Sequence, residues 1–218
     1  MTNTKSKRSK PKPDVESLQK DSAYRMILEL EFKDMIPFVL SNIRKRGLIP
    51  LFYISINAIC LLFIIFYAIW GANTGALNAG KISGQILAGI LAGSILVIPP
   101  HELLHGLAYR ILGARRISFG MDLQQFIFYV TADRFPITKR ELAFLALIPF
   151  ILINLALITF TAVWATRLTL FSATFLLCHN MMCIGDFAMI TYVFSKKGSI
   201  YTYDDTGNKK SFFFEKMK

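Results

Sequence analysis

The sequence predicts an α-helical integral membrane protein with about four transmembrane helices and a small cytoplasmic β-hairpin element. Two observations support this fold class. Hydrophobic residues make up 54% of the 218 residues, and the mean hydropathy of +0.46 is higher than in an ordinary soluble domain. The charged residues, 18% of the chain, lie mostly outside a few long apolar runs, as in a chain that crosses a membrane several times.

The N-terminal segment, residues 1–49, is polar or amphipathic. Residues 1–20 are rich in Lys, Ser and Pro and predict a disordered basic arm. Residues 22–47 mix apolar and charged positions around Pro37, which predicts one or two amphipathic helices at the membrane surface.

Four apolar segments follow, each long enough to cross a bilayer. They cover residues 50–70, 82–98 with a continuation to 113, 142–164 and 168–194. In the second segment, the pairs Gly80/Gly84 and Gly89/Gly93 have the small-xxx-small spacing that lets membrane helices pack closely.

Two polar segments predict short strands. Residues 115–132 alternate apolar and polar side chains and then become aromatic and β-branched, which indicates a hairpin. Residues 199–215 suggest two further strands around a turn at 205–208. We therefore divide the chain into an N-terminal segment (1–49), a transmembrane domain (50–195) and a cytoplasmic tail (196–218).

The distribution of Lys and Arg predicts the orientation in the membrane. Eleven lie in residues 1–49, six in 110–140 and six from 196 onward, whereas the other two loops hold one each, Lys81 and Arg167. The positive-inside rule then places both termini and the 110–140 loop in the cytoplasm of a multi-pass plasma-membrane protein. The net charge of +11 therefore indicates contact with the lipid bilayer rather than with nucleic acid.

The segment "HELLH" places His101, Glu102 and His105 inside a predicted span. Ionisable groups are costly in hydrocarbon and rarely persist there without a partner or a function. On a helix, histidines four residues apart share one face and can bind one metal, while the adjacent carboxylate acts as a general base. The alternative is that the histidines only join helices and that Glu102 pairs with an arginine. Pro99 and Pro100 predict a helix break just before the motif.

A catalytic zinc site needs three protein ligands, and the motif supplies two. We predict Asp186 as the third, because it lies about as far from the cytoplasmic end of its span as His101 does from the end of its own. Its neighbour Gly185 would allow the helices to approach closely. His179 and Cys183 are rival ligands, but His179 would lie about 10 Å deeper than Asp186. We expect His179 to stabilise the oxyanion or to line the cavity, and the alternative is a plain interhelical hydrogen bond.

These residues carry a family resemblance. The segments "PPHELLHGLAYRILG", "LALIPF" and "CIGDFAMI", with the hairpin between the first two, resemble a family of bacterial membrane proteins described as putative zincin peptidases, over about residues 95–210. More distantly, the pattern is similar to site-2-type intramembrane zinc metalloproteases. It departs from them at Asp186, which is followed by Phe187 and has no nearby proline, and in having no segment that resembles a PDZ domain.

The resemblance implies a zinc-dependent membrane metalloendopeptidase that hydrolyses membrane or membrane-proximal polypeptides. The alternative is a non-catalytic membrane scaffold or regulator that retains the His-Glu-x-x-His site. An ion path for transport is a third hypothesis, which no internal repeat supports. The strand segment 115–132 also predicts an exposed edge that would hold an extended substrate, although an ordinary surface hairpin is equally compatible with the sequence. The sequence does not identify the substrate or the oligomeric state.

Overall fold

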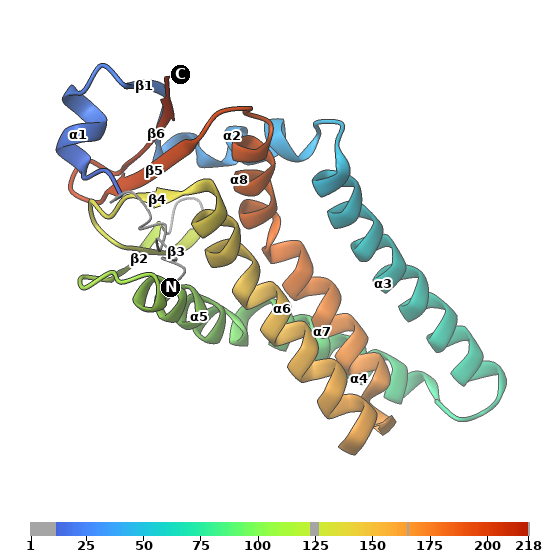
Figure 1. The fold of residues 1–218 in the computed structure, drawn as a ribbon. Helices are drawn as coiled ribbons and strands as arrows, with labels where there is room; N and C mark the ends of the chain where they lie inside the picture. The colour runs from blue at the N-terminus through green and yellow to red at the C-terminus, as the bar shows by residue number, and fades with distance from the viewer. Residues whose placement is uncertain (1–11, 123–126, 165, 218) are drawn as a thin grey trace, which may run out of the picture.

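The computed structural model describes residues 12–122, 127–164 and 166–217, and it shows a helical part with a small sheet at one end (Figure 1). The long helices are α3 (Leu48–Asn73), α4 (Ala79–Leu91), α5 (Ile98–Ile111), α6 (Lys139–Trp164), α7 (Thr169–Met182) and α8 (Ile184–Phe194). Helices α3 and α6 lie alongside α7 and α8, which follow one another end to end, and α5 runs beneath the hairpin at the sheet end.

Within the described residues, three helices are long and apolar enough to cross a membrane: Leu48–Asn73, Ala79–Ile111 and Lys139–Trp164. The pair α7 and α8 is the fourth candidate if it counts as one span, and its two halves are bent by 45°. Three of the four predicted apolar spans are thus confirmed by length and composition, and the fourth coincides with the bent pair. The bend at Cys183 was not predicted, because neither proline nor glycine lies at the break.

The second span is irregular just before the predicted metal motif. A π-helical segment, η2 (Ala92–Leu96), separates α4 from α5, and Pro99 and Pro100 lie in the first turn of α5. Proline fits a first turn because its missing N–H has no helical partner there. The backbone is thus irregular just before the motif, as predicted, but Ala79–Ile111 still counts as one span.

Glycines bring the second span against α7. Close packing was predicted at two glycine pairs, and the structure shows it at one of them. A Cβ atom at Gly89 would lie 2.7 Å from the carbonyl oxygen of Phe171, and one at Gly93 would lie 2.5 Å from that of Phe175. Gly84 has no atom within 4 Å of such a position, and Gly80 meets only the side chain of Asn78 at 3.6 Å. Close packing therefore depends on Gly89 and Gly93.

The polar ends of the chain form one sheet. Its strand order is β1 (Tyr24–Glu31), β6 (Lys210–Lys216), β5 (Ile200–Asp205) and β4 (Ile137–Thr138), with all neighbours antiparallel. The two predicted tail strands are confirmed. The helical prediction for residues 22–47 is wrong over β1, and only α2 (Met35–Ile43), after the short turn η1 (Phe32–Asp34), is an α-helix. Pairing of β1 with β6 explains the strand, and it joins the N-terminal segment to the tail.

The predicted disordered arm is also partly wrong. Residues Val15–Lys20 form helix α1, whose first turn is capped by Asp14 through a hydrogen bond from the backbone N–H of Ser17 (2.8 Å). Leu18 is buried against Tyr203 and Phe214 of the sheet, which stabilises a helix too short to persist alone. Residues 1–11 of the predicted arm lie outside the described residues.

The predicted hairpin is confirmed. Strands β2 (Ser118–Asp122) and β3 (Ile127–Thr131) pair antiparallel, with Ser118 opposite Thr131. The connection, residues 123–126, lies outside the described residues. The hairpin sits between α5 and the four-stranded sheet, beside the cytoplasmic end predicted for the second span (Figure 1).

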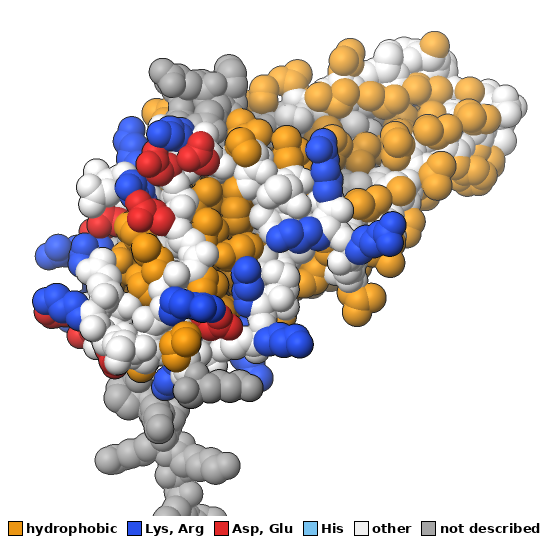
Figure 2. All heavy atoms as spheres, turned by 90° about the horizontal axis from the view of Figure 1, so that it is seen from above, with side chains coloured by type: hydrophobic (Ala, Val, Ile, Leu, Met, Phe, Trp, Pro, Cys, Tyr) orange, Lys and Arg blue, Asp and Glu red, His pale blue; other side chains and the backbone are white. Residues whose placement is uncertain are grey.

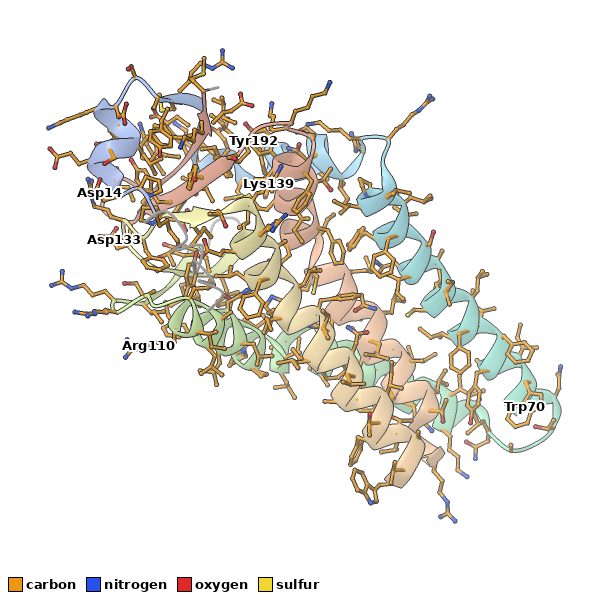
Figure 3. All side chains as sticks on the ribbon, in the orientation of Figure 1. Asp14, Trp70, Arg110, Asp133, Lys139 and Tyr192 are labelled. Carbon is orange, nitrogen blue, oxygen red and sulfur yellow. The ribbon has the colours of Figure 1, made fainter. Side chains whose placement is uncertain are left out.

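Charge and apolar surface separate along the molecule. Seen from above, Lys, Arg, Asp and Glu side chains gather over the sheet end, whereas the helical end is covered by hydrophobic side chains (Figure 2). Asp14, Asp133, Lys139 and Tyr192 lie toward the sheet end, and Trp70 lies at the opposite end of α3 (Figure 3). This separation is what a molecule with one polar end and an apolar helical body in lipid requires.

Candidate metal centre

Three predicted ligands converge at the sheet end of the helices. His101 and His105 lie one turn apart on α5, and their Nε2 atoms are 3.1 Å apart. From α8, the two carboxylate oxygens of Asp186 reach these atoms, at 3.6 Å from His101 Nε2 and 3.5 Å from His105 Nε2. Both imidazoles are buried. The three groups form a cluster that could hold a metal ion.

The donor set and its spacing fit zinc. Imidazole nitrogen and carboxylate oxygen are both common zinc donors, and ligands about 2.0–2.1 Å from a tetrahedral ion lie roughly 3.3 Å from one another. The three observed separations span 3.1 to 3.6 Å. The residues present therefore fit the metal that the motif predicts. They leave a further position for water or substrate, as catalytic zinc sites do.

A backbone hydrogen bond fixes the ring of His105. Its Nδ1 atom lies 3.1 Å from the carbonyl oxygen of Leu145 on α6. Because a carbonyl oxygen only accepts, Nδ1 carries the hydrogen and Nε2 keeps its lone pair toward His101 and Asp186. Such outer hydrogen bonds orient metal-binding histidines and raise their basicity. A backbone acceptor leaves no signal in the sequence, so this contact was not predicted.

His179 supports His101 from the other side. Its Nε2 atom is 3.2 Å from Nδ1 of His101, so the ring that faces Asp186 through Nε2 is held through its second nitrogen by α7. This contact is the interhelical hydrogen bond given as the alternative for His179. The sulfur of Cys183 lies 3.8 Å from the same His179 nitrogen. His101, His179 and Cys183 make a second cluster with ligand-type atoms, which shares His101 with the first.

One prediction about a neighbouring residue, Gly185, fails, and so does the alternative given for Glu102. No atom lies within 4 Å of a Cβ placed on Gly185, so this glycine does not bring helices into close contact. It lines an open cavity instead. Glu102 forms no ion pair with an arginine among the described residues, which removes the main structural alternative for its carboxylate.

A cavity of about 550 Å³ adjoins the cluster. His101, Glu102, His105 and Asp186 lie in its wall at one end. Apolar side chains of η1, α2, α6 and α8 line much of the remainder, and strand β3 contributes the run 128–131. The cavity is therefore large enough for several residues of a peptide, and the charged groups of the candidate metal centre open into it.

Comparison with known families agrees with this site. A family model described as "Putative zincin peptidase" matches residues 94–201. Over this segment, the chain is similar to the family of that description. No curated protein and no solved structure matches the chain.

The matched segment contains every residue of the candidate centre. It begins inside η2, includes α5, the hairpin, α6, α7 and α8, and ends as β5 begins. It leaves out α1, β1, α2 and β6, although α2 lines the cavity and β1 and β6 complete the sheet. The walls of the cavity therefore come partly from residues outside the family match.

Sequence reasoning missed one member of the α5 face. Tyr109 follows His105 by four residues, as His105 follows His101, so the three side chains share one face of α5. All three line the cavity. The four-residue spacing was the available signal, and it extends the polar face of α5 one turn toward the sheet.

Proposed function

We propose that this chain is an integral-membrane zinc metalloendopeptidase that hydrolyses peptide bonds of membrane or membrane-proximal polypeptides. The observation that carries the proposal is the convergence of two histidines and one carboxylate beside Glu102, in a cavity of peptide size. The family match supports the metallopeptidase class. The apolar helices support a site in the plasma membrane, with both termini in the cytoplasm as the Lys and Arg distribution predicts.

In this proposal His101, His105 and Asp186 hold the zinc ion. Bound zinc polarises a carbonyl group and lowers the pKa of water toward neutrality. Glu102, in the cavity wall, accepts the proton of the attacking water and passes it to the leaving amine. The Leu145 carbonyl orients the ring of His105, and His179 orients the ring of His101. In these orientations the Nε2 atoms of both rings face Asp186.

Strand β3 is the proposed guide for the substrate. Its one partner among the described strands is β2, so its other edge keeps unpaired backbone groups. Residues 128–131 of the strand line the cavity. A peptide adding to this edge would lie extended along the cavity, and extended chains are what peptidases cleave. The prediction of an edge strand over 115–132 thus becomes specific to β3.

The proposal is tested with Glu102→Gln, which removes the base and keeps the size of the side chain. We expect zinc content equal to that of the native chain and loss of proteolysis by at least about 100-fold, the usual contribution of a general base. Zinc content is measured by atomic spectroscopy, and proteolysis with a library of apolar peptides in detergent micelles. Glu16→Gln, at an exposed carboxylate paired with Lys20, is the matched control.

Two results would contradict a peptidase. Cleavage that persists in Glu102→Gln would exclude Glu102 as the base. Zinc binding by the native chain with no cleavage of any peptide would favour the non-catalytic scaffold or regulator.

A further inference from the structure

The cavity has a second polar region, away from the candidate metal centre. It is formed by Tyr109 of α5, Thr131 of β3, Thr202 and Asp204 of β5, and Ser211 of β6, all of which line the cavity. Four of these five residues are buried, and Asp204 is partly buried. Nothing in the proposed hydrolysis uses these groups.

Asp204 carries the carboxylate of this region, and this carboxylate can accept further hydrogen bonds. Its Oδ1 atom accepts a hydrogen bond from the hydroxyl of Ser211 (2.6 Å), and the side chain of Tyr109 lies close enough to interact with the carboxylate. A carboxylate has about four acceptor positions, so further donors find room. Within the described residues Asp204 forms no ion pair, because the nearby Arg134 pairs with Asp205 (3.3 Å). Burial raises the pKa of Asp204, which a bound cation would oppose.

Thr131 provides an independent sign that something binds here. It is 4% exposed, and its hydroxyl oxygen is buried with no hydrogen-bond partner in the described structure. A buried hydroxyl without a partner is costly, and such groups are uncommon in folded proteins. Because Thr131 and Asp204 line the same cavity, a ligand carrying several N–H donors would have a partner in each group.

The distance to the candidate metal centre suits a peptide. Tyr109 lies one helical turn after His105, a rise of about 6 Å along α5. An extended peptide advances about 3.3 Å per residue. A group bound at Asp204 therefore belongs to a residue about two positions from the bond beside Glu102. Strand β3, whose residues line the wall between the two regions, keeps the same chain extended.

We infer that Asp204, with Tyr109 and Thr131, forms a specificity subsite for a cationic nitrogen of the substrate. An ammonium group gives three donors, which match a carboxylate with free acceptor positions and an unpartnered hydroxyl oxygen. The source of the ammonium is a lysine side chain or a free peptide N-terminus near the cleaved bond. This inference rests on the proposed peptidase function, because it assigns the substrate of the same cavity.

Binding tests the subsite separately from cleavage. The protein is the full-length chain with Glu102→Gln, loaded with zinc in detergent micelles. The probes are fluorescent apolar decapeptides, acetylated at the N-terminus, with either one lysine or one norleucine at each central position. A second set has a free N-terminus and no lysine, and distinguishes the two sources of ammonium. Fluorescence anisotropy gives the Kd of each peptide.

We expect one of the two ammonium sources to bind at least about tenfold more tightly than its neutral counterpart. Asp204→Asn should abolish this preference and leave the Kd of the neutral peptide unchanged. Asp133→Asn is the matched control, because this neighbouring carboxylate does not line the cavity and accepts hydrogen bonds from Thr206. Thr131→Val, of nearly equal shape, should weaken the preference in part.

The subsite is excluded if the parent protein shows no preference for either ammonium. It is also excluded if Asp204→Asn weakens charged and neutral peptides equally, since the carboxylate would then only join the helix to the sheet. Loss of zinc in Asp204→Asn would indicate that this variant does not fold, and the test would then rest on Thr131→Val. A Thr131→Val variant with unchanged zinc content and an unchanged preference for the charged peptide would count against the subsite. A preference seen without cleavage by the native chain would retain the subsite and reject the peptidase. Cleavage by the native chain, without a preference for either ammonium, would retain the peptidase and reject the subsite.

Discussion

At the scale of single residues, the candidate centre depends on which nitrogen of each imidazole is free. His105 is fixed by a backbone carbonyl and His101 by the Nε2 atom of His179. For His101 to bind metal through Nε2, its Nδ1 must donate to His179. His179 then acts through His101 and is a positioning residue.

The first prediction concerns His179. His179→Ala should lower zinc affinity by about 10- to 100-fold, the usual effect of losing an outer hydrogen bond to a ligand. His179→Gln keeps an acceptor and should recover part of the loss. Competition with a chromogenic chelator measures both affinities. Equal zinc affinity in the alanine variant and the native chain would show that the contact has only a packing role.

Asp186 gives the second prediction. Asp186→Ala removes a ligand, so zinc should be lost more completely than in His179→Ala. Cys183→Ser is the control at the bend between α7 and α8, and it should keep its metal. Zinc stoichiometry is measured on folded, detergent-purified protein. Full metal retention by Asp186→Ala, with loss in His179→Ala, would transfer the ligand role to the second cluster of His101, His179 and Cys183.

At the scale of elements, helix α5, which carries the motif, is preceded by a segment that packs tightly against α7. The π-helical segment η2 lies immediately before α5, and Gly93 within it lies directly against the backbone of α7. Segments of this kind often occur at functional sites. Since α7 also carries His179, the helix that packs against η2 is also the helix that supports His101.

The third prediction tests this contact. Gly93→Ala places a methyl group 2.5 Å from the carbonyl oxygen of Phe175, so the helices must separate. We expect a destabilisation of about 1–3 kcal/mol, as for overpacked interiors, together with weaker zinc binding. Gly84→Ala, on the same span with open space around it, should be neutral or slightly stabilising. Thermal unfolding in detergent compares the two, and equal Tm values would contradict the packing role.

The free edge of β3 gives the fourth prediction. Single prolines at positions 128, 129 and 130 remove one backbone donor each. The backbone N–H groups of successive strand residues point alternately toward one neighbouring strand and toward the other. The cleavage rate should therefore decrease only when proline replaces a residue whose N–H points away from β2. Zinc content should remain constant in those variants. Unchanged turnover in every folded variant would leave β3 as an ordinary surface hairpin.

At the scale of the whole molecule, the polar elements gather at one end. Helix α1 and strands β1, β5 and β6 come from the two ends of the chain, whereas strand β4 and the hairpin come from its middle (Figure 1). The loop after α3, near Trp70, lies at the opposite end (Figure 3). This arrangement agrees with the sidedness that the Lys and Arg distribution predicts, in which the sheet end faces the cytoplasm.

The fifth prediction is that topology. In a chain with Cys60, Cys178 and Cys183 replaced, a single cysteine at Ala76 should react with an impermeant reagent added outside the cell. A cysteine at Asn208, in the turn between β5 and β6, should react only after permeabilisation. Labelling at position 76 from the cytoplasmic side alone would reverse the topology.

The sequence predicted those features that are encoded locally. The apolar spans follow from hydropathy, the break before α5 from two prolines, and the shared face of His101 and His105 from the four-residue spacing. The hairpin and the tail strands follow from alternation and turn residues. Asp186 was also found from sequence, because matching depth in two spans is a consequence of helix rise.

What depends on distant contacts was decided only by the tertiary structure. Residues 24–31 have a mixed pattern that fits a surface helix, and they form a strand because β6, nearly two hundred residues away in the chain, provides its hydrogen-bond partners. The support of His105 by the Leu145 carbonyl, the bend at Cys183 and the meeting of Tyr109 with Asp204 have no local signature either. The physical reason is that hydrophobic spacing fixes which face of an element is buried, whereas the backbone groups and side chains it meets depend on how the elements pack.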